Sequence, residues 1–200
     1  MSYKPPIQHR AKVTEEKFLS AFDELMRENG FEQTTVDEIA QRAGLTRASF
    51  LARFGSKEQA LLILYSRYCD RATKTMYKFM DELPLETDML MVLENMSKQL
   101  LVLVVRDLSS NRAMHEHFLK NLETHDLTKG IFRTCVQMMT AVQNRFLEPG
   151  SFTANGAWSA AQLLVTIEFN SALQGMPGLP QDTNARHRLV AEILALALQK

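Results

Sequence analysis

The sequence predicts an all-α protein of about nine helices, in which three amino-terminal helices precede a larger helical bundle. Apolar residues recur at helical spacing through most of the chain, and the sustained apolar–polar alternation of half-buried strands does not occur. Residues that cap helices, mainly Thr and Ser, precede several of the apolar segments, and glycines or prolines follow them. At 200 residues, 46% of them hydrophobic, the chain is long enough to bury one or two cores.

The first helix is expected from about Thr14 to Gly30. Phe18 and Phe22 recur on one face of this segment, which predicts that the face packs into a core. Thr14 is placed to cap the amino terminus, where Glu15 suits the positive end of the helix dipole. Gly30 suits the exit, because glycine readily adopts the left-handed conformation that ends many helices.

A short second helix is expected over residues 36–43. Thr35 and Glu38 form the Thr-x-x-Glu pattern of a capping box, in which each side chain bonds the backbone N–H of the other residue. Ala40 is small where a following helix would approach. Gly44 ends the segment and can adopt the positive φ that a sharp turn requires.

A third helix is expected over residues 47–53, between Thr46 and Gly55. A fourth begins at a second capping-box pattern, residues 56–59, and is expected to run to about Met80. The second and third helices, joined by a glycine turn, have the dimensions of a helix-turn-helix, in which two helices cross steeply.

Five further helices complete the predicted fold. We expect them near residues 87–107, 110–123, 128–147, 153–174 and 183–198. Prolines, glycines and serines mark most of the breaks, of which the loop at residues 175–180 is the richest in Gly and Pro. The apolar run 100–105 is also compatible with a strand, but no partner strand is evident, so a helix is favoured.

Positive charge gathers around the predicted helix-turn-helix, although the whole chain is neutral with 23 basic and 23 acidic residues. The segment from Ile39 to Lys57 contains four bases and no acid, and residues 1–14 also carry bases without an acid. Phosphate binding depends on such a local patch rather than on net charge, so the pattern favours contact with DNA. The alternative is an ordinary helical hairpin with a solvated basic face.

The same region carries a family resemblance. The elements Gly30-Phe31, Thr34-Thr35-Val36, Ile39-Ala40, Ala43-Gly44 and Phe54-Gly55-Ser56-Lys57-Glu58 occur in this order. Over about residues 14–62 the sequence resembles the DNA-binding domain of TetR-family transcriptional regulators. The resemblance implies a cytoplasmic homodimer, usually a repressor that a small molecule releases from a pseudo-palindromic double-stranded DNA operator.

The resemblance also assigns DNA-binding roles by position. Thr35 would hold a phosphate, Arg47 would read a base edge, and Lys57 would bind a second phosphate. Arg10 is expected on a flexible arm over the DNA backbone or the minor groove. The full set of expected DNA contacts is Arg10, Thr35, Thr46, Arg47, Ala48, Ser49, Leu51, Arg53 and Lys57.

Leu51 departs from the family pattern, which commonly has a tyrosine whose hydroxyl bonds a phosphate there. Leucine cannot form this bond, although it can contact a thymine methyl group, and Arg53 can supply a phosphate contact instead. The departure keeps a second function open: an all-helical small-molecule-binding protein with a degenerate DNA-binding head.

We divide the chain into a basic arm (1–13), a helix-turn-helix domain (14–60) and a helical ligand-binding and dimerisation domain (61–200). In the last domain, residues 154–173 and 189–198 are apolar on more than one face, as expected of helices covered on both sides. A twin subunit would supply the second cover, whereas central helices of a monomer are the alternative. The expected interface residues are Ala161, Leu164, Ile193 and Leu194.

Methionine is concentrated after the amino-terminal domain, with nine of the 11 methionines at or beyond Met76. This pliable side chain suits a cavity for a hydrophobic ligand. The expected lining residues are Met96, Gln99, Leu100, His115, Phe118, Phe132, Met139, Trp158 and Gln162. Ordinary core packing is the alternative for each of them.

Other classes of function find little support in the sequence. The longest aliphatic run has six residues, far below the roughly 20 of a membrane span, and no secretory signal begins the chain. Neither a nucleophile elbow nor a phosphate or dinucleotide loop occurs, so we expect no enzyme activity and no cofactor. His115 and His117 point apart on a helix and make poor joint metal ligands, and Cys69 and Cys135 are expected to be buried thiols.

Overall fold

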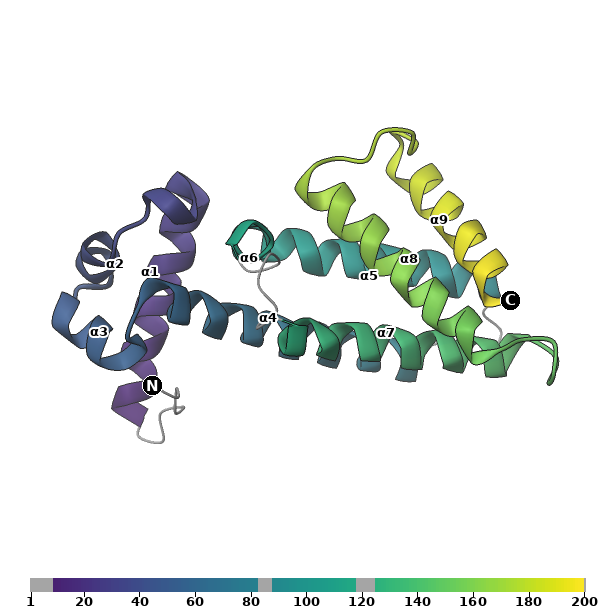
Figure 1. Cartoon of the computed structure of the whole chain (residues 1–200), viewed down its shortest axis with the longest axis horizontal. Helices are drawn as coiled ribbons and strands as arrows, with labels where there is room; N and C mark the ends of the chain where they lie inside the picture. Colours follow the sequence, from purple (N-terminus) through teal and green to yellow (C-terminus); the bar gives the residue numbers. More distant parts are fainter. Residues whose placement is uncertain (1–8, 83–87, 118–124, 200) are drawn as a thin grey trace. The chain divides into compact units, whose positions relative to one another are not determined.

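The computed structural model describes residues 9–82, 88–117 and 125–199, which are drawn as helices and connecting loops in Figure 1. No strand occurs among these residues. The helices of this part are α1 (His9–Gln33), α2 (Val36–Ala43), α3 (Arg47–Phe54), α4 (Lys57–Asp81), α5 (Met89–Arg106), α6 (Leu108–His117), α7 (His125–Phe146), α8 (Ala154–Leu173) and α9 (Thr183–Leu198). The predicted all-α fold is confirmed.

The chain divides into two compact units. The head unit comprises residues 1–68 and 109–124, and the bundle unit comprises residues 69–108 and 125–200. The division falls inside α4, which is one continuous helix. Each unit has its own buried apolar residues.

α1 begins earlier than the sequence predicted, at His9 rather than near Thr14. The Thr14 hydroxyl donates to the carbonyl oxygen of Arg10, 3.0 Å away, so Thr14 lies inside the helix and does not cap it. Arg10 therefore belongs to a helix and not to a flexible arm. The predicted exit is confirmed, because Gly30 has a φ of 80° and interrupts the helical geometry just before the last residues of α1.

Aromatic side chains hold the first three helices of the head unit together. The Phe18 ring of α1 meets the Phe50 and Phe54 rings of α3 edge-on, with centroids 5.3 and 5.9 Å apart. Ile39 of α2 is fully buried, and α2 packs against both α1 and α3. Edge-to-face aromatic packing is directional, so these contacts fix the orientation of α3 within the head unit.

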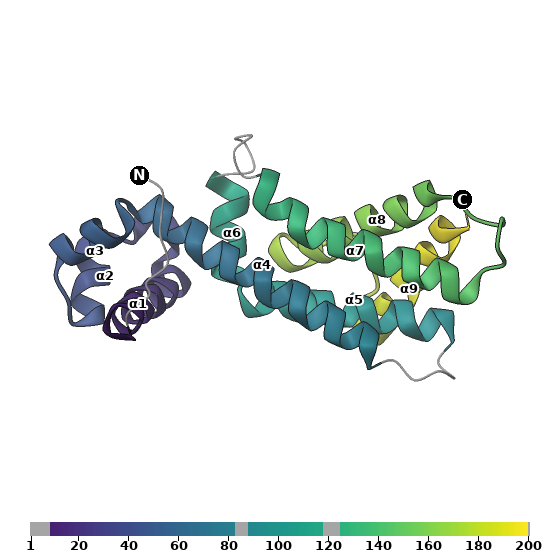
Figure 2. The ribbon, with the colours of Figure 1, turned by 90° about the horizontal axis from the view of Figure 1, so that it is seen from below.

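The bundle unit is built around α8. This helix packs against α5, α7 and α9, and α5 also packs against α9 (Figure 2). Gly156 permits a close approach of α8 to the end of α9, since a Cβ at this position would lie 2.8 Å from the carbonyl oxygen of Leu198. The Gln143 amide of α7 donates to the same carbonyl at 2.8 Å, which joins three helices at one point.

The remaining boundaries lie close to the predicted ones. The apolar run 100–105 is helical within α5, and α9 spans the predicted residues 183–198. α6 is described from Leu108 to His117, and the rest of the predicted helix 110–123 lies outside the described residues.

Candidate nucleic-acid interface

Capping side chains set the geometry of the helix-turn-helix. The Thr35 hydroxyl accepts from the backbone N–H of Glu38, and the Glu38 carboxylate accepts from the backbone N–H of Thr35 at 2.8 Å. The hydrogen bonds from Thr35 lower the pKa of Glu38. Gly44 ends α2 with a φ of 67°, and the Thr46 hydroxyl caps α3 by accepting from the backbone N–H of Ser49. The predicted caps and turn are therefore confirmed.

α3 has one buried face and one exposed face. Phe50 and Phe54 lie in the head core, whereas Arg47, Ala48 and Leu51 are exposed. A short helix whose inner face is fixed presents its outer side chains at constant positions. Reading base edges in a major groove requires this kind of presentation.

The predicted base-reading residue, Arg47, is exposed and forms an ion pair with Asp37 of α2. Its Nη1 lies 2.6 Å from the Asp37 Oδ2 atom, and both side chains are more than half exposed. Exposed pairs of this kind contribute little in water. The guanidinium can therefore exchange Asp37 for another acceptor at small cost.

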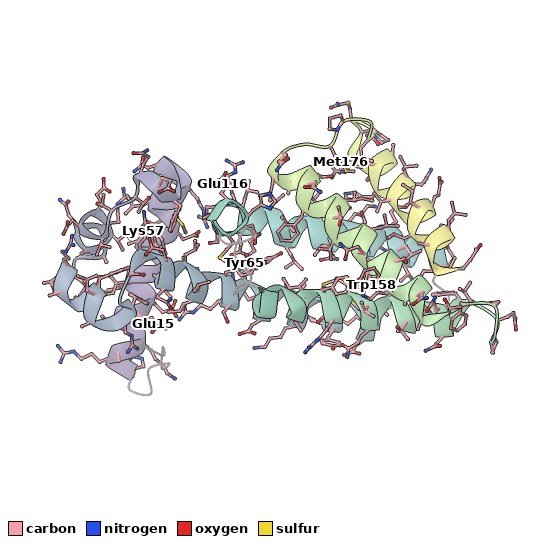
Figure 3. All side chains as sticks on the ribbon, in the orientation of Figure 1. Glu15, Lys57, Tyr65, Glu116, Trp158 and Met176 are labelled. Carbon is pink, nitrogen blue, oxygen red and sulfur yellow. The ribbon has the colours of Figure 1, made fainter. Side chains whose placement is uncertain are left out.

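Lys57 has partners that the sequence analysis did not predict. Its Nζ donates to the carbonyl oxygens of Phe31 at 2.8 Å and Thr34 at 3.0 Å, and it lies 4.2 Å from the centroid of the Phe31 ring. A cation at the carboxyl-terminal carbonyls of a helix compensates their partial negative charge. Lys57 therefore fastens the start of α4 to the end of α1, and its phosphate contact stays a prediction (Figure 3).

All the residues predicted to contact DNA belong to the head unit, and none of them is buried. They are Arg10, Thr35, Thr46, Arg47, Ala48, Ser49, Leu51, Arg53 and Lys57. Arg10 is exposed on α1, and the half-buried Arg53 at the end of α3 donates from Nε to the Glu15 carboxylate at 2.9 Å. Glu15 is a residue that the sequence analysis placed only at the helix dipole.

The residues predicted to line a ligand cavity do not form one group. Some are buried in the bundle core, some are exposed on the bundle unit, and Phe132 packs edge-on against Trp158 with ring centroids 5.6 Å apart. The buried residues are Met96, Leu100 and Met139, and the exposed residues are Gln99, Trp158 and Gln162. His115 belongs to the head unit, and Phe118 lies outside the described residues.

Most of the residues predicted to form a dimer interface lie inside the bundle unit itself. Ala161, Leu164 and Leu194 are fully buried within the chain, and Ile193 is half-buried. The large apolar side chains that α8 and α9 leave exposed are Trp158, Leu163 and Leu196. A second subunit on these helices would contact the exposed set.

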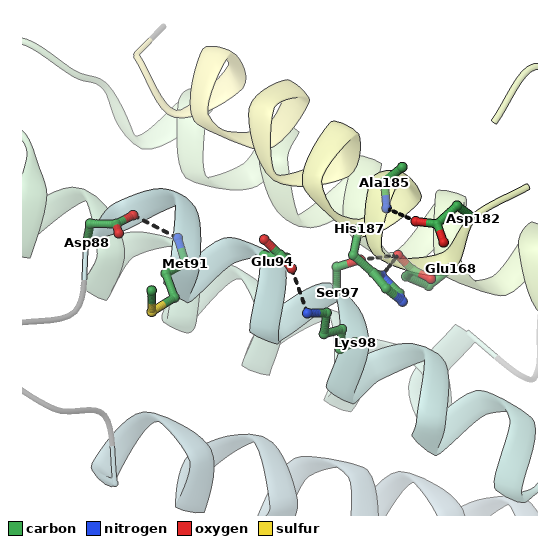
Figure 4. A network of polar contacts seen from close by, with 9 residues as sticks. All are labelled: Asp88, Met91, Glu94, Ser97, Lys98, Glu168, Asp182, Ala185 and His187. Atoms are coloured by element: carbon green, nitrogen blue, oxygen red, sulfur yellow. Dashed lines mark hydrogen bonds and ion pairs between the residues drawn. The ribbon is translucent and has the colours of Figure 1, made fainter. Parts of the chain in front are cut away.

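Glu168, an acid in the apolar α8, belongs to a polar cluster with Ser97 and His187. The Ser97 hydroxyl donates to Oε1 of Glu168 at 2.5 Å and lies 2.6 Å from Nδ1 of His187 (Figure 4). All three side chains are buried. Burial raises the pKa of Glu168 and lowers the pKa of His187, so both groups favour their uncharged forms. The cluster joins α5, α8 and α9 by polar contacts inside an apolar bundle.

In the described ranges, no group of three or more His, Cys, Asp or Glu side chains could hold a metal ion. Cys69 and Cys135 are both buried, and burial raises the pKa of Cys135 to about 12, which disfavours a reactive thiolate. None of the helices that the structure describes is long and apolar enough to cross a membrane.

The fold and the exposed face of α3 define a helix-turn-helix DNA-binding protein. Residues 18–62 match the model of the bacterial regulatory proteins of the tetR family. The match covers the helix-turn-helix part of the chain, where the sequence resemblance lies, and it supports a DNA-binding regulator. A search of curated protein sequences gave no match.

Solved structures share the fold over nearly the whole chain. The fatty acid degradation regulator FadR from Bacillus halodurans is 17% identical, with 96% of each chain covered and a TM-score of 0.70. A TetR-family regulator from Mesorhizobium loti is 15% identical, with 94% of this chain and 98% of that chain covered and a TM-score of 0.69. FadR from Bacillus subtilis in complex with stearoyl-CoA is 20% identical, with 90% and 96% covered and a TM-score of 0.66.

Proposed function

We propose that the protein is a cytoplasmic transcriptional repressor that binds a pseudo-palindromic operator as a homodimer and leaves it when a small hydrophobic ligand binds. The observation that carries the DNA-binding half is α3, a doubly capped helix with a fixed aromatic inner face and an exposed outer face. In this proposal residues 1–13 and 14–60 contact DNA, and residues 61–200 bind the ligand and the second subunit.

In the proposed complex, the outer face of α3 lies in the major groove. Arg47 exchanges Asp37 for the O6 and N7 atoms of a guanine, and Leu51 contacts a thymine methyl group. Thr35 lies near a phosphate at the start of α2, where the backbone N–H groups of the helix also favour an anion. Lys57 has three N–H donors, so a phosphate would replace one of its carbonyl partners on α1.

The hydrophobic character of the ligand is supported by two observations. The bundle unit buries several methionines, among them Met76, Met96 and Met139, and such side chains rearrange readily around an apolar guest. FadR from Bacillus subtilis, which shares the fold, was solved with stearoyl-CoA. We therefore choose stearoyl-CoA as the probe of the ligand class.

The test is a competition on a preformed complex between the full chain and a labelled duplex from the region upstream of its own gene. Stearoyl-CoA is expected to lower the fluorescence anisotropy of the duplex, and coenzyme A alone is expected to leave it unchanged. Release by both compounds would contradict a hydrophobic ligand. If neither compound changes the binding of the protein to the duplex, acyl-CoA is excluded as the ligand class, and the proposal of DNA binding is unaffected.

Dimerisation through α8 and α9 is tested with exposed residues, since a charge at the buried Leu194 would disturb the fold itself. Leu196→Glu on α9 changes a side chain that is 65% exposed, and Val102→Glu on α5 changes a control that is 62% exposed. Light scattering is expected to give a monomer mass for the first variant and a dimer mass for the second. A dimer mass for both would contradict this interface.

A further inference from the structure

The head unit contains a buried carboxylate that is paired with two cations. Glu15 on α1 is 1% exposed and accepts hydrogen bonds from Nε of Arg53 at 2.9 Å and from Nη2 of Arg67 at 2.8 Å. Arg53 lies at the end of α3 and Arg67 lies on α4, so the carboxylate joins three helices. A buried ion pair is seldom more stabilising than well-packed apolar residues. Stability alone therefore does not explain this pair, and the side chains that it orients matter more.

Arg53 also lines a groove beside α3. Arg10, Ala11 and Thr14 of α1 and Ser49, Ala52 and Arg53 of α3 surround an open space of about 440 Å³. Two of these side chains are cationic and none is acidic. The Thr14 and Ser49 hydroxyls donate to the carbonyl oxygens of Arg10 and Thr46, so the two arginines are the groups of this groove that suit an anion.

The guanidinium of Arg53 has hydrogen-bonding capacity left for such an anion. In the described part of the chain its only hydrogen bond runs from Nε to Glu15, and its side chain stays 24% exposed where it lines the groove. The planar guanidinium donates from two sides, so a partner on Nε fixes the direction in which the terminal nitrogens point. Arg67 shares the Glu15 charge, which leaves positive charge at the groove.

We propose that this groove takes a backbone phosphate of bound DNA and that Glu15 is the positioning residue that directs Arg53 toward it. The inference rests on the proposed function, because the phosphate reaches the groove only when α3 lies against a duplex. Arg10 is then the second cation on the same phosphate, from the first helical turns of α1. An acidic residue thereby strengthens the binding of a polyanion.

The direction in which DNA affinity changes when Glu15 is substituted distinguishes this positioning role from simple electrostatics. Removing an acid from a DNA-binding surface strengthens binding when only charge matters. Glu15→Ala is instead expected to weaken binding to every duplex about tenfold. The slope of log K against log salt concentration is expected to become shallower by the amount that corresponds to about one phosphate contact. Arg53→Ala is expected to do the same, and the double variant is expected to bind no more weakly than Arg53→Ala.

Glu16 provides a matched control. It neighbours Glu15 on α1, is largely exposed and, among the residues that the structure describes, pairs with Arg67 at 2.7 Å. Glu16→Ala is expected to leave DNA affinity unchanged or slightly raised, with an unchanged salt slope. Circular dichroism establishes that each variant is folded. If Glu15→Ala is unfolded, Glu15→Gln serves in its place, with an expected loss of about threefold because the amide can satisfy only one arginine.

The proposal is overturned if folded Glu15→Ala or Glu15→Gln binds DNA as tightly as the unchanged protein with the full salt slope. It is also overturned if Arg53→Ala binds normally, or if the double variant shows additive losses. If the unchanged protein binds no duplex, both this inference and the proposed function fail. If it binds and only the Glu15 variants behave normally, the inference alone fails.

Discussion

In the described parts of the head unit and the bundle unit, one glutamate each is buried at the junction of three helices, and the two are stabilised in opposite ways. Glu15 in the head unit is paired with two guanidinium groups, whereas Glu168 in the bundle unit contacts the hydroxyl of Ser97, which also bonds His187. The head unit thus keeps charge near its surface, where an anion can use it. The bundle unit favours uncharged polar groups in its interior, which suits an apolar environment.

The contrast predicts that Glu15→Ala has the largest effect on stability. It leaves the partly buried Arg53 and Arg67 without their shared acceptor, so we expect the free energy of unfolding to fall by about 3 kcal/mol. Urea denaturation followed by circular dichroism measures the change. A loss below about 1 kcal/mol, the size expected of the exposed Glu16→Ala, would mean that Glu15 does not organise the head unit.

The bundle unit is expected to be more sensitive to close packing than to charge. Gly156→Ala brings a Cβ within 2.8 Å of the Leu198 carbonyl oxygen and of the Gln143 amide nitrogen, and we expect a loss of about 1–3 kcal/mol. Gly130→Ala on α7 is the matched control, because no atom lies within 4 Å of its added Cβ. The control should gain up to about 1 kcal/mol from helix propensity, and equal thermal shifts for the two variants would refute the packing argument.

A smaller effect, with a defined sign, is expected from Glu168→Gln. Burial raises the pKa of Glu168 above its ordinary 4.5, so the folded chain holds this proton more tightly than the unfolded chain does. Stability contributed by the protonated acid is present below pH 4.5 and is lost as pH rises through the raised pKa. The stability of the glutamine variant relative to the unchanged protein should therefore increase as pH rises from 4 to 7.

His187 changes the pH dependence of stability in the opposite direction, and it is present in both the unchanged protein and the Glu168→Gln variant. Its pKa is lowered from 6.5 by burial and by the charges of Arg186 and Lys98, with an opposing effect of Glu94, so its contribution to stability falls as pH drops below 6.5. Subtracting the two unfolding curves at each pH removes this shared contribution. A difference that stays constant from pH 4 to pH 7 would contradict the raised pKa of Glu168.

The smallest effect is expected from Asp37→Asn. The Asp37–Arg47 pair is exposed, so its loss should change the free energy of unfolding by less than about 1 kcal/mol. DNA binding should become slightly tighter, because Arg47 no longer has to leave an acidic partner. A loss of DNA affinity would indicate that Asp37 orients Arg47 as Glu15 is proposed to orient Arg53.

Much of the head unit was predictable because its signals are local in sequence. The Thr35–Glu38 capping box and the turn at Gly44 act within a few residues of their partners. The start of α1 was mispredicted because Thr14 can bond a carbonyl four residues back as well as cap a helix. The roles of Glu15 and Lys57 were missed, since Arg53, Arg67 and the α1 carbonyls are brought to them only by the fold.

The bundle unit was predictable as a set of helices but not as a packed core. Helical spacing gave the bounds of α9, yet Ser97 and His187 lie 90 positions apart and no local pattern pairs them. The same spacing could not distinguish helix faces covered by the chain from those left for a partner. Ala161 and Leu194 are accordingly buried inside the unit, while Leu196 and Trp158 are exposed.

The central claim is that α3 reads duplex DNA, and a titration of the Arg47→Ala variant tests it most directly. The labelled duplex is the region upstream of the protein's own gene, with a scrambled duplex beside it and Lys78→Ala as an exposed charge-loss control. We expect tight, salt-sensitive binding by the unchanged protein and by the control. Arg47→Ala should lose about 1–3 kcal/mol of binding free energy together with base preference. Unchanged affinity and preference in Arg47→Ala, or no binding by the unchanged protein, would contradict the claim.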